Sequence, residues 1–246
     1  ACYKWNRKLQ NPTYQKSLCN VSGRMITNQP RAITGINKVF TFNECHPNCG
    51  CNKEVCLNFL CQSHNKKRYK LQITRQKRDQ VTMWGVVALE EIPAGVFLME
   101  YRGEIVTKKQ GDMRGTFYDY NGLSYLFDMN DPPEDDEYTQ QVQMAYANEF
   151  FPLCLDAMFY GNESRFINHS CDPNVQSFNL SGQYESSAIH SIGLFTSKRV
   201  QVGDELTMDY QWDKNDLMIA KDVPCLCFTP KCRGYLMHAK KKKGAK

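Results

Sequence analysis

The cysteines of this chain are crowded into short stretches, and this crowding limits how the chain can fold. Eight of the twelve cysteines lie in two groups, one spanning seventeen residues and one spanning eight: Cys45, Cys49, Cys51, Cys56 and Cys61, then Cys225, Cys227 and Cys232. Disulfides could staple such groups in a secreted domain. In a reducing compartment, thiolates this close repel one another unless a cation holds them, so the spacing favours zinc.

The composition predicts one substantial core with small satellites. An apolar fraction of 41% in 246 residues is ordinary for a globular protein. No apolar run approaches the ~18 residues that are needed to cross a membrane, and the first twenty residues are too polar for a signal peptide. We therefore expect an intracellular protein with no membrane partner.

The excess positive charge is concentrated at the C-terminal end. Five of the 31 Lys and Arg residues lie in the last ten positions, so the rest of the chain carries 26 basic against 26 acidic residues. Such an end is typically a solvated tail, and weak contact with nucleic acid is the alternative. A second basic run, residues 66–78, alternates with Tyr69, Leu71 and Ile73, which predicts an amphipathic strand.

Hydrophobic alternation between turn residues predicts a mainly β domain with short helices. The predicted strands cover residues 84–89, 96–101, 103–106, 123–129, 153–156, 189–197 and 205–210. Residues 92–95 and 203–204 are typical of turns. Residues 160–168 indicate a short helix. Residues 130–137 indicate an exposed acidic loop, and the weak periodicity of 138–151 indicates a further helix in the same insertion.

Two motifs about forty residues apart carry most of the information on function. The first motif is Arg165-Phe166-Ile167-Asn168-His169-Ser170-Cys171-Asp172-Pro173-Asn174. The second is Leu206-Thr207-Met208-Asp209-Tyr210, with Cys225-x-Cys227-x4-Cys232 after it. Together they resemble the SET-domain protein lysine methyltransferases. The resemblance covers about residues 45–236. It implies a SET-domain fold of small β-sheets with a C-terminal pseudoknot, flanked by small zinc modules.

The resemblance also implies a division of the chain. The expected parts are an N-terminal segment of unknown role (1–40), a reduced pre-SET-like zinc module (41–64), a SET catalytic domain (65–212) with an acidic insertion near 130–152, a linker (213–224), a post-SET zinc module (225–236) and a basic tail (237–246).

The same resemblance implies S-adenosylmethionine as a methyl donor. Asn168 and His169 would hold it, with Arg165 and Phe166 beside them. The family's first donor-binding segment is matched by Met83-Trp84-Gly85, where the glycine allows close backbone approach. The methionine of this segment departs from the family, which usually has glycine there.

Methyl transfer to a lysine requires a neutral amine. Because the ordinary pKa of a lysine side chain is about 10.4, deprotonating it at pH 7 costs about 4.6 kcal/mol. A tight aromatic channel and a sulfonium charge both favour the neutral amine, so positioning and desolvation suffice without a strong base. By resemblance, Tyr101 lines the lysine channel, Tyr125 lies near both donor and lysine, and Tyr210 is catalytic. The alternative for each is a half-buried strand aromatic with a satisfied hydroxyl.

Met208 differs from the family, which usually has Phe or Tyr two residues before the catalytic tyrosine. A tyrosine hydroxyl there tends to stop the reaction at one methyl group. Methionine has no hydroxyl and is flexible. The sequence therefore predicts a product above monomethyl-lysine, up to trimethyl, and simple core packing of this side chain is the alternative.

Two kinds of zinc site are expected. In the family, the fourth ligand beside Cys225, Cys227 and Cys232 is the cysteine of the Asn-His-Ser-Cys run, here Cys171. The N-terminal group resembles the last part of the pre-SET module of suppressor-of-variegation methyltransferases. There, one zinc is expected on four thiols, and a second could use Cys19 and Cys61. These four thiols belong to Cys45, Cys49, Cys51 and Cys56.

The chain looks most like the methyltransferases that act on lysine-9 of histone H3. Asp128 matches an acidic residue that meets the arginine before that lysine, and a turn-capping role is the alternative. The resemblance implies a monomer that binds the histone H3 tail within chromatin. It implies a place in the nucleus, on the chromosome, and a role in heterochromatin and gene silencing. Another histone lysine, such as lysine-36, and a catalytically silent chromatin-binding module remain open alternatives.

Overall fold

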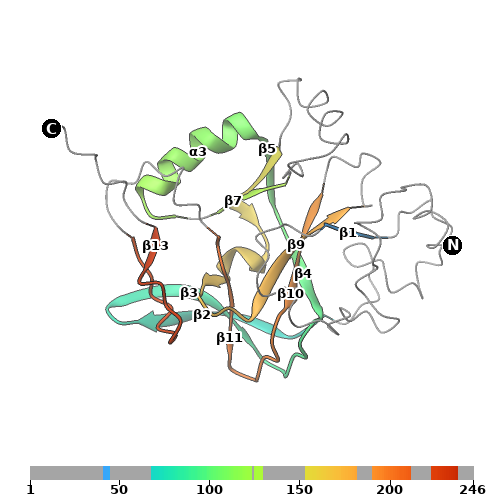
Figure 1. Cartoon of the computed structure of the whole chain (residues 1–246), viewed down its shortest axis with the longest axis vertical. Coiled ribbons are helices and arrows are strands. Elements are labelled where there is room, and N and C mark those ends of the chain that lie inside the picture. The colour runs from blue at the N-terminus through green and yellow to red at the C-terminus, as the bar shows by residue number, and fades with distance from the viewer. Residues whose placement is uncertain are drawn as a thin grey trace, which may run out of the picture.

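The computed structural model describes residues 41–44, 68–123, 125–129, 153–181, 190–211 and 223–237. In chain order its elements are β1 (Thr41–Asn43), β2 (Leu71–Arg78), β3 (Val81–Ala88), β4 (Phe97–Tyr101), β5 (Gly103–Thr107), α3 (Lys108–Tyr120), β6 (Leu126–Asp128), β7 (Leu153–Gly161), the 3-10 helix η2 (Glu163–Phe166), β8 (Asn168–His169), β9 (Val175–Ser181), β10 (Ser191–Thr196), β11 (Glu205–Met208), β12 (Val223–Pro224) and β13 (Tyr235–Met237). Figure 1 shows α3 on one side of the molecule and the β2–β3 hairpin on the other.

The largest sheet has eight strands and brings distant parts of the chain together. Its path is β2-β3-β11-β9-β10-β4, with β1 paired to β9 and β8 paired to β11. The strand β11 runs antiparallel to β3 and parallel to β8 and β9. Because β11 lies between β3 and β8, residues from three separate stretches meet at this point of the sheet, as Figure 1 shows for β3 and β11.

The strand β10 is fully buried along its length between β9 and β4. Gly193 in this strand is required by packing, since an added Cβ would lie 2.6 Å from Leu180 Cδ1. The core of the molecule gathers around this strand and its neighbours. Its most buried members include Val86, Ala88, Ile92, Ile167, Val175, Ile192, Leu194, Val200 and Leu206.

A second sheet, in the order β5-β7-β6, carries α3. The helix begins after Thr107, whose hydroxyl accepts the Gln110 N–H while the Gln110 side chain accepts the Thr107 N–H. Gly111 and Tyr118 face inward from the helix. Tyr118 donates its hydroxyl proton to Asp156 on β7 at 2.8 Å, which joins helix and sheet. Within the described part of the chain, no helix is both long enough and apolar enough to span a membrane.

The mainly β fold is confirmed, and most predicted strands are present within one to three residues at each end. The helix predicted over 160–168 is wrong at both ends. Residues 160–161 continue β7, residues 163–166 form only a 3-10 turn, and residue 168 begins β8. The reason is tertiary pairing, since Gly161 pairs with Gly103 and Asn168 with Thr207. The acidic loop and the helix predicted at 138–151 lie outside the described residues.

Candidate active site

The parallel pairing of β8 with β11 brings the two motifs together. Thr207 lies opposite Asn168 and Met208 opposite His169. Beyond the end of β11, the backbone N–H of Tyr210 donates to His169 Nδ1 at 3.2 Å, and the two rings meet edge to face with centroids 5.3 Å apart. The sequence-based expectation that these two segments pass side by side therefore agrees with the structure.

His169 is held as a neutral ring. Burial lowers its pKa, Arg233 lowers it further, and Asp209 works in the opposite direction. Nδ1 accepts the Tyr210 N–H, and Nε2 lies 3.4 Å from Cys171 Sγ and 3.2 Å from Arg233 Nη2. The His169 ring thus contacts both the segment that contains Tyr210 and Cys171, which follows His169 in the first motif.

Asn168 is fixed by two hydrogen bonds from its side-chain nitrogen. Nδ2 donates to the Trp84 carbonyl at 2.8 Å and to Glu205 Oε1 at 2.7 Å. Trp84 is half-exposed on β3, with the Arg75 guanidinium 5.2 Å from the ring centroid. This places the predicted donor-binding segment 83–85 beside Asn168.

Gly85 has a local reason for being glycine. An added Cβ would lie 2.6 Å from Glu205 Oε1 and 2.8 Å from Gln76 Cγ. The close approach that the sequence indicated at this position is therefore made by two side chains of this chain. Met83, which precedes Trp84, is half-buried on the same strand and pairs with Gln76.

The three predicted tyrosines gather at one place in the core, where Tyr101 is buried and Tyr125 and Tyr210 are partly buried against it. The hydroxyl of Tyr101 donates to the Tyr125 carbonyl at 3.2 Å, and that of Tyr210 donates to the Ile167 carbonyl at 2.9 Å. Burial raises the pKa of Tyr210 well above its usual range, and the neighbouring Tyr101 and Tyr125 raise it further. Burial raises the pKa of Tyr101 in the same way. Both hydroxyls therefore stay protonated at neutral pH and can donate hydrogen bonds.

Arg165 packs its guanidinium against two aromatic rings beside this group. Its guanidinium lies 4.9 Å from the Tyr125 ring centroid and 4.7 Å from that of Phe166. Its Nε and Nη2 donate to the carbonyls of Ala157 and Met158, each at 2.6 Å. The planar cation thus fixes the positions of two predicted donor-binding aromatics.

Met208 packs into the core next to this group. Its side chain is 8% exposed and belongs to the same buried cluster as Tyr101, with Tyr125 and Tyr210 packed against that cluster. No hydroxyl is introduced at this position, and the flexible thioether fills the space.

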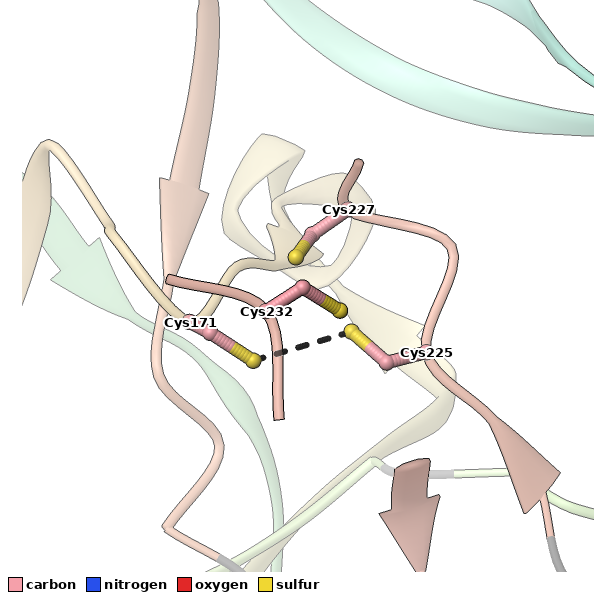
Figure 2. A group of neighbouring side chains, drawn as sticks. All are labelled: Cys171, Cys225, Cys227 and Cys232. Atoms are coloured by element: carbon pink, nitrogen blue, oxygen red, sulfur yellow. Dashed lines mark hydrogen bonds between the residues drawn. The ribbon is translucent and has the colours of Figure 1, made fainter. Parts of the chain in front are cut away.

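Four cysteine thiols converge next to the first motif. Figure 2 shows the side chains of Cys171, Cys225, Cys227 and Cys232 pointing toward a common centre. All four Sγ atoms lie within 4.8 Å of one another, and Cys171 and Cys225 are 3.7 Å apart. Four sulfurs around a tetrahedral zinc at about 2.3 Å would stand about 3.8 Å apart. The donor set and its spacing therefore fit zinc.

Backbone and side-chain groups of the C-terminal segment support this quartet. The N–H of Arg233 donates to Cys171 Sγ at 3.3 Å, and the N–H of Gly234 donates to Cys232 Sγ at 3.4 Å. Arg233 also donates through Nη2 to Asp209 Oδ1 at 2.8 Å. Since Asp209 immediately precedes Tyr210, this arginine joins the cysteine quartet to the tyrosine segment.

Asp128 lies at the end of β6 and is about half exposed. Its carboxylate accepts hydrogen bonds from Lys108 Nζ at 3.1 and 3.2 Å and from Cys154 Sγ at 3.0 Å. The predicted contact with a substrate arginine would therefore have to compete with Lys108, a residue that the sequence did not single out. The predicted N-terminal ligands Cys45, Cys49, Cys51 and Cys56 lie outside the described residues.

Glu205 and Arg78 were also missed by the sequence analysis. Glu205 lies between Asn168 and Arg78, and the guanidinium of Arg78 binds its carboxylate directly. The two residues are 127 positions apart. A single sequence holds no local pattern that could pair them.

The sequence of this chain is similar to a known family and to curated proteins. The SET domain family matches residues 83–211. Histone-lysine N-methyltransferase SUV39H2 of Xenopus tropicalis is 37% identical over 204 residues, which covers 78% of this chain and 45% of that protein. The chain thus spans less than half the length of this curated relative.

Two solved structures extend the comparison to the fold. Arabidopsis thaliana SUVH6, solved in complex with SAM, superposes with a TM-score of 0.66 at 26% identity and covers 96% of this chain and 43% of that one. The Neurospora SET domain protein DIM-5, a histone lysine methyltransferase, gives a TM-score of 0.59 at 28% identity, with 89% and 78% covered.

Proposed function

The chain belongs to the SET domain family, and from this premise we propose that it is an S-adenosylmethionine-dependent histone-lysine N-methyltransferase. The observation that carries the proposal is the meeting of Tyr210 with Asn168 and His169 through the β8–β11 pairing. A curated relative named as a histone-lysine N-methyltransferase and a neighbour solved with SAM support it.

The donor would lie against the surface formed by the first motif and β3. S-adenosylmethionine supplies an electrophilic methyl group on a sulfonium. The residues proposed to hold it are Met83, Trp84, Gly85, Tyr125, Arg165, Phe166, Asn168, His169 and Tyr210. Their fit rests on Asn168, whose Nδ2 is fully used by Trp84 and Glu205, while no described residue donates to its Oδ1. That oxygen is available to accept from a donor ammonium group.

Tyr101, Tyr125 and Tyr210 would form the wall of the lysine channel. The three rings are apolar and their hydroxyls are uncharged, so the channel would favour a neutral amine over an ammonium. Tyr210 would orient the amine toward the methyl carbon, and the channel would exclude water. This is why neither a histidine nor a carboxylate is needed as a strong base.

We further propose zinc on Cys171, Cys225, Cys227 and Cys232 as a structural ion. Zinc would supply the positive charge that lets four thiolates stand together. Cys171 holds one end of the quartet three residues after Asn168, and the C-terminal segment holds the other. The N-terminal thiols Cys45, Cys49, Cys51 and Cys56 are proposed to bind one or two further zinc ions.

The target we propose is lysine-9 of the histone H3 tail, with products up to trimethyl-lysine. The resemblance to the suppressor-of-variegation type supports the target, and Asp128 remains a proposed contact for the preceding arginine. The buried Met208, which brings no hydroxyl, supports the product state. With this activity, we propose that the protein acts in the nucleus, on chromatin, in heterochromatin formation and gene silencing.

The test combines a donor-binding titration with methylation of a histone peptide array by the full chain. We expect saturable donor binding and a signal confined to peptides that contain lysine-9 of histone H3. Tyr210→Phe should keep donor binding and lose most turnover, while Tyr120→Phe, at an exposed helix position, should change neither. Donor binding without methylation of any peptide would instead identify a silent binding module, and a signal at lysine-36 would reassign the target.

The product state has its own experiment. Met208→Tyr places a hydroxyl beside the tyrosine group, where it can hold a water in the space that a methylated amine needs. We expect mass spectrometry to show mainly monomethyl product for this variant and higher states for Met208→Phe. Trimethyl product from Met208→Tyr would refute the role proposed for Met208.

A further inference from the structure

Arg78 and Glu205 form an ion pair directly behind Asn168. Arg78 lies at the end of β2 and Glu205 at the start of β11, and their side chains are only 14% and 15% exposed. One carboxylate oxygen, Oε2, binds Arg78 Nη2, and the other, Oε1, accepts from Asn168 Nδ2 at 2.7 Å. Asn168, Glu205 and Arg78 thus form a chain of hydrogen bonds from the proposed donor site into the sheet.

This chain of bonds dictates which way the Asn168 amide points. Its two N–H groups face the Trp84 carbonyl and the Glu205 carboxylate, and both of these groups can only accept. A flipped amide would place its oxygen against two acceptors, including one full negative charge. The nitrogen is therefore locked inward and Oδ1 is directed away from Glu205.

We propose that Glu205 and Arg78 are positioning residues that lock Asn168 in the orientation in which its Oδ1 accepts a hydrogen bond from the methyl donor. The inference rests on the proposed function, because it assigns the residues that prepare the donor site. Neither residue is proposed to touch the donor. They act through the amide of Asn168.

Position 78 requires a guanidinium because this side chain makes two contacts in different directions. While Nη2 binds Glu205, Nη1 donates to the Leu226 carbonyl at 2.8 Å. Leu226 lies between Cys225 and Cys227, so the same guanidinium ties the cysteine quartet to the residue that orients Asn168. A lysine carries a single ammonium and cannot hold this fork geometry.

Gly85 provides the space for this pair. A Cβ at this position would lie 2.6 Å from Glu205 Oε1, the oxygen that binds Asn168. Gly85→Ala should therefore displace the carboxylate without changing any charge.

The decisive measurement is donor affinity by calorimetry on the full, zinc-loaded chain, with S-adenosylmethionine as the probe. For Glu205→Gln we expect the donor Kd to rise about tenfold, since a hydrogen bond to a charged group is lost or reversed. The KM for the histone peptide and the zinc content should stay unchanged. Arg78→Lys should weaken donor binding in the same direction, and it remains informative if Glu205→Gln fails to fold.

The matched control is Glu91→Gln, which breaks the exposed ion pair of Glu91 with Arg199 at 2.5 Å. Its donor affinity should equal that of the unmodified chain. Equal donor Kd values for Glu205→Gln, Arg78→Lys and the unmodified chain would overturn this inference and leave the proposed function intact. An unmodified, zinc-loaded chain that binds no donor would overturn the proposed function, and this inference with it.

Discussion

The buried carboxylate of Asp156 offers the sharpest test of how the α3 layer is held to the sheet. The side chain of Asp156 has no exposed surface. Its Oδ2 accepts from Arg114 Nη1 at 2.7 Å and from Tyr118 at 2.8 Å, and its Oδ1 accepts from the Met158 N–H at 2.9 Å. Two of the three donors come from α3, so this carboxylate joins the helix to β7.

Asp156→Asn keeps the volume of the side chain and changes only its charge and one acceptor. The new NH₂ group must face at least one of the three donors, and the guanidinium of Arg114 loses one of its two carboxylates. Breaking a buried pair by altering one partner costs about 3–5 kcal/mol. Because Asn retains one acceptor, we expect about 3 kcal/mol, or a melting temperature lower by about 6–12 °C at about 2–4 °C per kcal/mol.

The matched control is Glu104→Gln, since Glu104 binds the same Arg114 at 2.7 Å but its side chain is 40% exposed. An exposed ion pair contributes at most about 1 kcal/mol. Urea unfolding followed by circular dichroism gives both free energies of unfolding under identical conditions. Equal losses for the two variants, or a loss below about 1 kcal/mol for Asp156→Asn, would refute the assignment of the buried carboxylate as the main tie.

The pKa of Tyr118 distinguishes loss of its hydrogen bond to Asp156 from a general loss of packing between α3 and the sheet. Burial and the hydrogen bond to Asp156 raise the pKa of Tyr118 to about 12. In Asp156→Asn the bond to a full negative charge is gone, so the pKa of Tyr118 should fall. Absorbance titration of Asp156→Asn against the double variant that also carries Tyr118→Phe isolates this tyrosine.

Three further outcomes are expected. Phe228 has a φ of 51°, a left-handed backbone that costs a bulky residue about 1–2 kcal/mol, so Phe228→Gly should raise the melting temperature. Burial raises the pKa of the Cys154 thiol to about 12, so peptide mapping after iodoacetamide at pH 8 should find it unmodified in the folded protein. Burial raises the pKa values of Tyr101 and Tyr210, so the unfolded state ionises first and the urea midpoint should fall as pH rises through about 10, less steeply in Tyr101→Phe.

The strands were predictable because their signal is local. Alternation of apolar and polar residues between turns located β3, β4, β5, β10 and β11, and the basic run 66–78 contains β2. The helix α3 was missed because its sequence carries Gly111 and Gly115 and only weak amphipathicity. Its stability comes from tertiary contacts, such as the close fit of Gly111 against Cys154, where an added Cβ would lie 3.0 Å from Sγ. The strand β9 was also missed, since its polar residues mask the alternation.

The residues of the candidate site also fall into those with a local sequence signal and those without one. The residues of the two motifs were predictable because each motif is contiguous in the sequence, and the pairing of β8 with β11 brings them together. The residues that hold the motifs in place were not predictable. Arg78 and Glu205 find their partners far away in the chain, and a charged residue on a strand looks the same in the sequence whether its partner is water or the side chain of Asn168.

The C-terminal segment explains why so much of the site depends on long-range contacts. Arg233 binds Asp209 beside Tyr210, and Arg78 binds the carbonyl of Leu226 within the cysteine quartet. Each tie links the quartet to a different side of the site, one to the tyrosine and one to Asn168 through Glu205. An ion that gathers the four thiols would therefore restrain both sides at once. The cysteine quartet and Asn168 are then parts of one hydrogen-bonded unit.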